Sequence, residues 1–343
     1  MHVSVWDFIK SQLRKPKPVV EADLTGKTVV VLGANTGLGF EATKHFARMN
    51  PGRLILACRS EQKGRAAIDR LQAATGYAGA ELWIVDLAEF ASVKQFAAKF
   101  AQDGGRLDIL VENAAIAPEK YEPTNDGWDA ALQVNCLSTP LLGLLLLPSM
   151  IKTAQEHSVS PRLVVVSSSM HYWVDIEKKV SENPGILHTL GSAEYCATKA
   201  YETRYQLTKL LNVFFVRALN ARLPPTTPVI VDAVCPGYCY SELRRSMSGL
   251  RALIDYLMER AFAFTTEEGS RQLVWAALAH EDHPETIRGG YVSCSNVTEV
   301  SDYVLSAEGA RAEDHIWDEM VDILGKVDPR VTTIVDEYLV PRA

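Results

Sequence analysis

The chain alternates between short apolar runs and longer stretches in which apolar residues recur at helical spacing. The short runs are rich in valine, isoleucine and leucine, which is typical of strands buried on both faces of a sheet. They are Thr28–Leu32, Arg53–Ala57, Leu82–Val85, Ile109–Glu112, Arg162–Ser167, Val229–Val234 and Gly290–Ser293. The helical stretches are Leu38–Met49, Glu61–Ala74, Phe90–Ala101, Trp128–Glu156, Tyr201–Arg222 and Thr266–Ala279.

Strands that alternate with helices predict an α/β fold with a doubly wound parallel sheet of about seven strands and helices on both faces. No repeat or low-complexity linker interrupts the pattern, so residues 24–343 are predicted to form one domain after an N-terminal extension, residues 1–23. The tail beyond Asn296 has mixed helical character. Met170–Glu194 and Tyr238–Phe264 fit the pattern poorly, and long excursions of this kind often cover a substrate.

Composition and charge narrow the classes of function. The 343-residue chain has a formal net charge of −7, which argues against broad nucleic-acid binding because that needs a basic face. Of six cysteines only Cys235 and Cys239 are close in sequence, and no second pair completes a zinc site, so no metal is predicted. The thiols are expected to be reduced, as in the cytoplasm.

Two apolar segments bear on membranes. The run Leu141–Leu147 ends at Pro148 and is too short to span a bilayer, so it predicts a buried helix and no transmembrane segment. Residues 1–17 mix apolar and basic side chains. They either lie on a membrane surface as a short amphipathic helix, a weak peripheral contact, or pack on the protein's own surface.

A glycine-rich turn follows the first predicted strand and opens the first helix. Glycines at such a turn let the backbone approach a pyrophosphate, and the helix N-terminus offers unpaired N–H groups and the positive end of its dipole. The spacing is Gly-x3-Gly-x-Gly. The turn predicts a dinucleotide-binding site with contacts from Gly33, Asn35, Thr36, Gly37, Leu38 and Gly39.

The ends of the next two strands bear on the nucleotide. Arg59 follows the second strand, where NAD-selective proteins carry an acidic residue for the ribose 2′-hydroxyl. An arginine suits a 2′-phosphate through its charge and its planar fork of donors, so Arg59 predicts NADP(H). Asp86 and Leu87 follow the third strand. Asp86 either accepts from the adenine amino group or caps the next helix.

Further motifs follow in a fixed order. After the glycine turn and Asp86 come Glu112-Asn113-Ala114-Ala115, Val134-Asn135, a serine-rich strand end, Tyr-x3-Lys and Pro236-Gly237. In this order the sequence resembles the short-chain dehydrogenase/reductase family, in the branch of retinol-dehydrogenase-like and many fungal oxidoreductases. The resemblance covers residues 24–279 and implies a single-domain Rossmann fold. Glu112 and Ala115 depart from the family's Asn-Asn-Ala-Gly motif.

The resemblance implies a carbonyl reduction or its reverse. A tyrosine exchanges the proton with the substrate oxygen, and a lysine one helical turn along favours its phenolate. A serine donates a second hydrogen bond to the substrate oxygen, and an asparagine holds a proton-relay water. The catalytic residues implied are Asn135, Ser168, Tyr205 and Lys209. The residues implied to contact the cofactor are Asn113, Ala114, Tyr205, Lys209, Pro236, Gly237 and Ser241.

Two Tyr-x3-Lys segments compete for the catalytic role. One pairs Tyr195 with Lys199, and the other pairs Tyr205 with Lys209. A long apolar helix continues after Lys209, as a buried catalytic helix must, whereas Lys199 is followed by polar residues. The distance from Lys209 to the proline–glycine turn is also close to the family's usual one. This choice requires an insertion after Ser168, which a loop tolerates at small entropic cost.

The predicted function is an NADP(H)-dependent oxidoreductase for a carbonyl or alcohol of an apolar small molecule, either lipid, retinoid, terpenoid or polyketide-like. Aromatic residues in the two excursions suit such a pocket. One alternative is a catalytically silent NADP(H)-binding regulatory protein, which a broken Ser-Tyr-Lys-Asn set would indicate. A further alternative is a methyl donor-binding enzyme on a similar sheet, but Arg59 and the Tyr-x3-Lys segment have no role in such an enzyme. The resemblance also predicts a homodimer paired through the two long helices.

Overall fold

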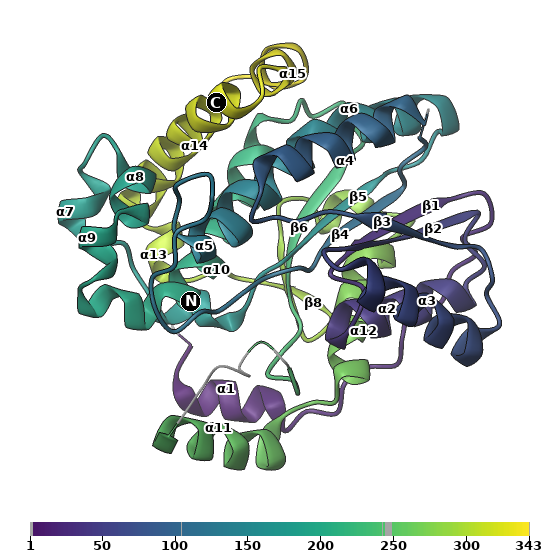
Figure 1. Cartoon of the computed structure of the whole chain (residues 1–343), viewed down its shortest axis with the longest axis horizontal. Helices are drawn as coiled ribbons and strands as arrows, with labels where there is room; N and C mark the ends of the chain where they lie inside the picture. Colours follow the sequence, from purple (N-terminus) through teal and green to yellow (C-terminus); the bar gives the residue numbers. More distant parts are fainter. Residues whose placement is uncertain (1–2, 104, 242, 244–248, 343) are drawn as a thin grey trace.

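A computed structural model describes residues 3–103, 105–241, 243 and 249–342 (Figure 1). Within these residues one sheet has the strand order β3-β2-β1-β4-β5-β6-β7-β8. The strands are β1 Thr28–Leu32, β2 Arg53–Cys58, β3 Ala80–Ile84, β4 Ile109–Glu112, β5 Arg162–Val166, β6 Ile230–Cys235, β7 Tyr291–Ser293 and β8 Asn296–Thr298. All pair in parallel except β7 with β8. The predicted doubly wound Rossmann-type fold is confirmed.

The eighth strand was not predicted, because the turn before it lacks the usual sequence signal. Cys294 and Ser295 connect β7 to β8, and both have positive φ, 51° and 54°. Two-residue hairpin turns of this kind favour asparagine and glycine, which carry little or no penalty in that region. A cysteine and a serine therefore do not reveal the hairpin.

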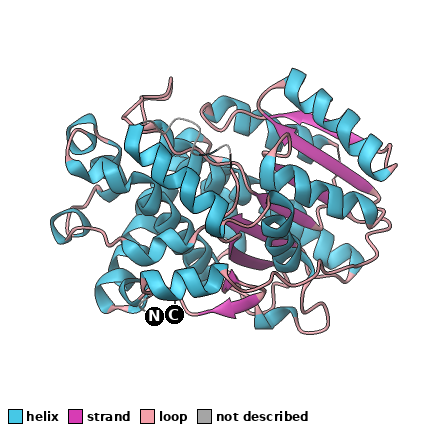
Figure 2. Cartoon of the chain, turned by 90° about the horizontal axis from the view of Figure 1, so that it is seen from below, coloured by secondary structure: helices cyan, strands magenta, loops and turns pink. Residues whose placement is uncertain are grey.

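Helices cover both faces of the sheet (Figures 1 and 2). Side chains alternate along β1, so that Val29 and Val31 belong to one core cluster and Val30 and Leu32 to the other. One face carries α2 Gly37–Arg48, α3 Glu61–Thr75 and α12 Thr266–Leu278. The other carries α4 Phe90–Gln102, α5 Ala130–Leu132, a π-helical turn Gln133–Ser138, α6 Thr139–His157 and α10 Arg204–Arg222.

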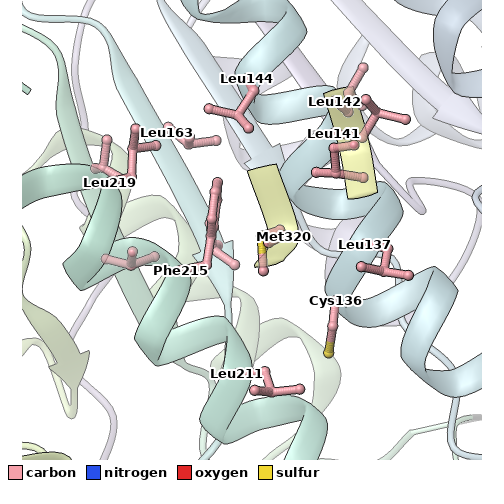
Figure 3. Close-up of a cluster of buried hydrophobic side chains, with 14 of the residues drawn as sticks. Cys136, Leu137, Leu141, Leu142, Leu144, Leu163, Leu211, Phe215, Leu219 and Met320 are labelled. Carbon is pink, nitrogen blue, oxygen red and sulfur yellow. The ribbon is translucent and has the colours of Figure 1, made fainter. Parts of the chain in front are cut away.

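The C-terminal helices cover the outer sides of the two long helices. α14 (Ala307–Val327) packs on α10, and α15 (Arg330–Tyr338) packs on α6. Figure 3 shows Met320 of α14 beside Phe215 of α10 and the leucines of α6. The segment Ala130–His157 is long and apolar enough to cross a membrane, but its most apolar window is 89% buried inside the protein. It is therefore a core helix, as predicted for Leu141–Leu147.

Short helices fill the two excursions that the strand–helix pattern did not explain. The excursion after β5 contains a 3₁₀ helix Ser169–Trp173, α7 Lys178–Ser181, α8 Ile186–Gly191, α9 Ala193–Cys196 and a 3₁₀ helix Lys199–Thr203. The excursion after β6 contains α11 Gly249–Phe262, and α13 Asp302–Leu305 follows the hairpin. A buried ion pair between Arg204 and Asp129 (3.5 Å) fastens the start of α10 to the N-cap of α5. Tyr201 adds a hydrogen bond to Asp129 (3.2 Å).

The N-terminal helix α1 (Val5–Gln12) lies against the molecule, beside α11 (Figure 1). A capping box between Ser4 and Asp7 starts it. Its inner side packs on the two excursions through Phe8, which contacts Trp173. The structure therefore shows that the inner side of this segment packs on the protein's own surface, and the weak membrane contact stays a prediction.

Candidate functional site

The predicted site residues lie where the carboxyl ends of β1, β4, β5 and β6 meet. In a doubly wound sheet the ligand crevice lies outside these ends, where the strand order reverses, here between β1 and β4. Gly33 follows β1, Asn113 follows β4, Ser168 follows β5, and Pro236 follows β6. The fold thus brings together segments that lie far apart in sequence.

The glycine turn has the geometry of a pyrophosphate cradle. Gly33 and Gly37 have positive φ, 69° and 60°. A Cβ on Gly39 would lie 2.5 Å from the Gly33 carbonyl oxygen and 2.6 Å from Asn113 Nδ2, so only glycine fits there. A Cβ on Gly37 would meet no atom within 4 Å. The Thr36 side chain does not cap α2, which leaves the helix N-terminus suited to an anion. These residues fit a dinucleotide.

Two neighbouring side chains at this edge fix the turn. Asn113 Nδ2 donates to the Leu32 carbonyl oxygen (3.1 Å), so this side chain joins the ends of β4 and β1. Ala114 lies directly against Gly33. Arg70 donates to the Asn35 carbonyl oxygen (2.7 Å) and holds the outer part of the turn.

The residues predicted to contact the adenosine half occupy the ends of β2 and β3. Arg59 follows β2 and is exposed. Asp86 accepts a hydrogen bond from the Ala88 N–H (2.9 Å) and so stabilises a local turn. It does not cap the next helix, because the N-cap of α4 is Glu89. Leu87 is buried in the core.

Tyr205 and Lys209 share one face of a continuous helix. α10 begins at Arg204, and Lys209 Nζ lies 5.5 Å from the centroid of the Tyr205 ring. Lys209 is only 2% exposed, and its Nζ donates to the Val166 carbonyl oxygen at the end of β5 (2.7 Å). The lysine therefore joins α10 to the end of β5, the strand that leads into Ser168.

Asn135 occupies the π-helical turn that precedes α6. Its side chain bonds both the N–H and the carbonyl oxygen of Ile116, at 3.0 and 2.9 Å. Its Nδ2 also donates to Thr208 Oγ1 (3.1 Å). The Asn135 carbonyl oxygen accepts from Asn212 Nδ2 (2.7 Å), and Asn212 in turn contacts Lys209 Nζ (3.4 Å). A π-helical turn holds one residue more than an α-helical turn, and such turns often mark functional sites. This one connects Asn135 to Lys209 through Asn212.

The serines after β5 point in different directions. Ser167 is buried, and its hydroxyl donates to the Lys209 carbonyl oxygen (2.9 Å). Ser168 is partly exposed, and its Oγ accepts from the Met170 N–H (3.2 Å). Ser167 and Ser168 thus point in different directions, as alternation along a strand predicts, and the assignment of the catalytic hydroxyl to Ser168 stays a prediction.

The competing pair is not on one helix. α9 ends at Cys196, and Lys199 begins a separate 3₁₀ helix. Tyr195 and Lys199 therefore lack the shared helical face that spacing of four implies. Tyr195 is partly buried in the excursion after β5, and burial raises its pKa.

Known proteins match this arrangement over most of the chain. The short chain dehydrogenase family matches residues 27–172. The short chain dehydrogenase/reductase dmxR8 of Cryptosporiopsis sp. (strain 8999) is 35% identical over 329 residues, which are 95% of this chain and 99% of that protein. The chain belongs to the short-chain dehydrogenase/reductase family. It is an oxidoreductase of the class that acts on CH–OH and C=O groups.

Two further matches show how widely this short-chain dehydrogenase/reductase fold is shared. The short-chain dehydrogenase anuD of Penicillium roqueforti (strain FM164) is 33% identical, with 96% of this chain and 85% of that protein covered. A crystal structure described as a short chain dehydrogenase from Escherichia coli CFT073 complexed with NADPH has a TM-score of 0.57 at 20% identity. It covers 80% of this chain and 99% of that one.

This short-chain dehydrogenase/reductase carries a glutamate where the family motif has asparagine. Glu112 is buried, and its carboxyl oxygens have no hydrogen-bond partner among the described residues. Burial raises its pKa well above the ordinary value, because the charged form loses hydration there. The structure places this carboxyl group beneath α6, beside Gly143.

The turn after β6 contains contacts that the sequence did not reveal. Gly237 has φ +84°, and its N–H donates to Cys235 Sγ (3.4 Å). The same sulfur accepts from the Ser169 N–H (3.2 Å), so Cys235 joins the loops after β5 and β6. Nothing in the sequence distinguishes this thiol from an ordinary buried cysteine. Ser241 Oγ accepts from the Leu243 N–H (3.1 Å).

We expect Lys209 to make stability depend on pH. Burial lowers its pKa from 10.5 to about 8, so between these values the unfolded chain binds a proton that the folded protein does not. The free energy of unfolding of the wild type should therefore rise relative to Lys209→Met as pH increases from about 8 to about 10.5. The full difference is about 3 kcal/mol. Urea unfolding at several pH values measures it, with exposed Lys10→Met as control. Parallel profiles for wild type and Lys209→Met would contradict the expectation.

Proposed function

We propose that this protein is an NADP(H)-dependent oxidoreductase that interconverts a carbonyl and an alcohol on an apolar small molecule, with Tyr205 as the acid/base. The observation that carries the proposal is the position of Lys209. It lies one helical turn from Tyr205, with its ammonium group 5.5 Å from that ring. A positive charge so placed lowers the cost of the phenolate, which a free tyrosine forms only near pH 10.

Each side chain has a defined part in this proposal. NADPH, when bound, supplies the hydride that reaches the carbonyl carbon. The Tyr205 hydroxyl gives its proton to the carbonyl oxygen, and Ser168 donates a second hydrogen bond to that oxygen as charge develops. Lys209, with its pKa of about 8, is charged at neutral pH and still able to pass a proton on. Asn212 bonds both the Lys209 ammonium group and the Asn135 carbonyl oxygen, and so connects the lysine to the π-helical turn.

NADP(H) is the cofactor that the residues favour. The glycine turn fits a pyrophosphate, and Arg59 is exposed at the end of β2, where a 2′-phosphate can meet its guanidinium. The E. coli structure of the same fold is complexed with NADPH, which supports the choice. We propose that Gly33 to Gly39, Arg59, Asp86, Leu87, Asn113, Ala114 and the turn Pro236, Gly237 and Ser241 hold it.

The substrate is proposed to be apolar and larger than a simple ketone. Trp173 and Tyr240, from the two excursions, remain partly exposed. Pockets for hydrophobic ligands are lined mostly by apolar and aromatic side chains, with few polar groups. The related proteins named above are fungal, and we propose a secondary-metabolite, terpenoid, polyketide or retinoid/lipid-like substrate on that analogy.

The setting of the enzyme is proposed as follows. Residues 24–343 act as one catalytic domain with residues 1–23 as its extension, and the protein works in the cytoplasm. A homodimer paired through α6 and α10 is not supported, because α15 and α14 already cover these helices. A dimer would need another face. The silent regulatory alternative is not favoured, because the Ser-Tyr-Lys-Asn set is intact.

The test is an assay of purified protein with NADPH and a panel of carbonyl compounds graded by apolar size. We expect NADPH oxidation to be faster with ring-bearing apolar ketones than with acetone-sized ones. The difference in kcat/KM should be about 100-fold, because each buried methylene contributes about 0.8 kcal/mol. The decrease in NADPH absorbance measures the rate. Absence of NADPH binding by fluorescence titration would refute the proposal.

A further inference from the structure

The inner side of α1 carries a glutamine that is almost completely buried. Gln12 is 6% exposed, although glutamine usually lies at the surface. Its Nε2 donates to the carbonyl oxygens of Tyr238 (3.0 Å) and Phe262 (3.2 Å). Its Oε1 accepts from the Tyr238 N–H (3.1 Å). The amide therefore uses both of its donors and one acceptor on backbone groups about 230 to 250 residues away in sequence.

These backbone groups lie at the base of the excursion after β6. Phe264 N–H donates to the Tyr238 carbonyl oxygen (2.9 Å), and Tyr240 N–H donates to the Phe264 carbonyl oxygen (3.0 Å). Cys239 and Phe264 form an isolated parallel bridge. We call residues 238–240 with 262–264 the stem of this excursion. Gln12 bonds both sides of the stem, much as a third strand would.

α1 also touches the other excursion, the one that begins beside Ser168. Phe8 lies edge-on to Trp173, with ring centroids 5.5 Å apart, and to Tyr238, 6.2 Å apart. Trp173 Nε1 donates to the Val3 carbonyl oxygen (2.9 Å). Residues of α1 thus contact both segments that flank the ends of β5 and β6.

The space enclosed by these contacts adjoins the proposed catalytic end. A cavity of about 180 Å³ lies under α1. Its walls include Phe8 and Gln12 on one side and Ser169, Cys235, Gly237 and Phe264 on the other. Ser169 is next to the proposed catalytic serine, and Gly237 is in the turn proposed to meet the cofactor. The N-terminal helix is therefore part of the wall around the site.

We propose that Gln12 is a positioning residue for the substrate side of the site, and that α1 supports substrate binding as part of the wall around the site. By bonding both sides of the stem, Gln12 holds residues 238–240 and 262–264 in place beside the cavity, where they support the wall that meets the distal part of the substrate. The inference rests on the proposed carbonyl reduction. A small carbonyl compound contacts only the catalytic end, whereas a bulky one also needs the wall that the stem supports.

The experiment compares Gln12→Ala and Gln12→Glu with wild type and with Lys10→Ala, an exposed change on the same helix. Gln12→Glu keeps the acceptor for the Tyr238 N–H but sets a carboxylate against two carbonyl oxygens. We expect both Gln12 variants to raise the KM of a bulky apolar ketone about 10-fold, because donors to buried backbone oxygens are lost. The KM of a small ketone and the Kd of NADPH should stay within about twofold. Lys10→Ala should match wild type.

Limited trypsin digestion gives a readout that does not depend on turnover. Cleavage between Tyr238 and Phe262, for example after exposed Arg260, should be faster in the Gln12 variants and unchanged in Lys10→Ala. Equal cleavage rates and an unchanged KM for the bulky ketone would overturn the proposal. So would equal losses for all carbonyl compounds together with weaker NADPH binding, because these indicate general unfolding. If the wild type reduces no carbonyl compound, the proposed function fails, and the cleavage rates alone decide the role of Gln12.

Discussion

Replacing Tyr205 with phenylalanine should lower kcat for carbonyl reduction about 1,000-fold and leave the Kd of NADPH nearly unchanged. The hydroxyl that gives the proton is lost, while the ring and its packing on α10 remain. Lys209 keeps its hydrogen bond to the end of β5, so the helix has no reason to shift. Residual turnover should come from hydride transfer with water as the proton source. Single-turnover kinetics with NADPH measure the loss directly.

Tyr195→Phe is the matched control, because it removes the same atom from the competing Tyr-x3-Lys segment. It should keep kcat within about twofold of wild type. Tyr195 lies on α9, which ends three residues before Lys199, so that pair has no common helical face. If Tyr195→Phe loses turnover and Tyr205→Phe keeps it, the assignment of the catalytic helix is wrong.

Replacing Arg59 with aspartate should change the cofactor preference. We expect kcat/KM for NADPH to fall about 100-fold, since a charge-assisted contact to the 2′-phosphate is replaced by repulsion. NADH should be used better than by the wild type, because an acidic residue at the end of the second strand can accept from the ribose 2′-hydroxyl. Arg59 is exposed, so the substitution should not disturb the fold.

Initial rates with NADPH and NADH, each at saturating ketone, test this expectation. Arg65→Asp on α3 is the control, because it makes the same charge change at an exposed site whose partner is Glu61. Arg65→Asp should change kcat/KM for NADPH and kcat/KM for NADH by no more than about twofold. Equal use of NADH and NADPH by the wild type would remove the role given to Arg59.

The sequence predicted the parts of this fold that depend on periodic burial. Apolar runs gave seven strands, and the helices between them followed from helical spacing. The apolar helix after Lys209 also favoured Tyr205, which the structure places on a continuous α10. The hairpin at Cys294 and the short helices of the insertion escaped prediction. A helix of four residues, such as α7, has too few turns to show a period.

Contacts between residues far apart in the sequence were harder to predict than helices and strands. Nothing in the residues around Gln12 indicates that its amide reaches Tyr238, 226 positions later. The raised pKa of Glu112 likewise depends on burial under α6, which a strand-end position does not reveal. Local sequence thus indicates which residues are candidates for the site. The tertiary fold determines which side chains support it.

The C-terminal helices have a consequence for how the enzyme behaves on dilution. α14 and α15 belong to the same chain as α10 and α6 and pack on them, and an ion pair between Arg217 of α10 and Glu313 of α14 (2.8 Å) holds α14 in place. The chain itself therefore provides the cover over both long helices, at an effective concentration that does not change with the amount of protein in solution. The helix that carries Tyr205 and Lys209 should stay supported in a single chain, and specific activity should not fall as the protein is diluted.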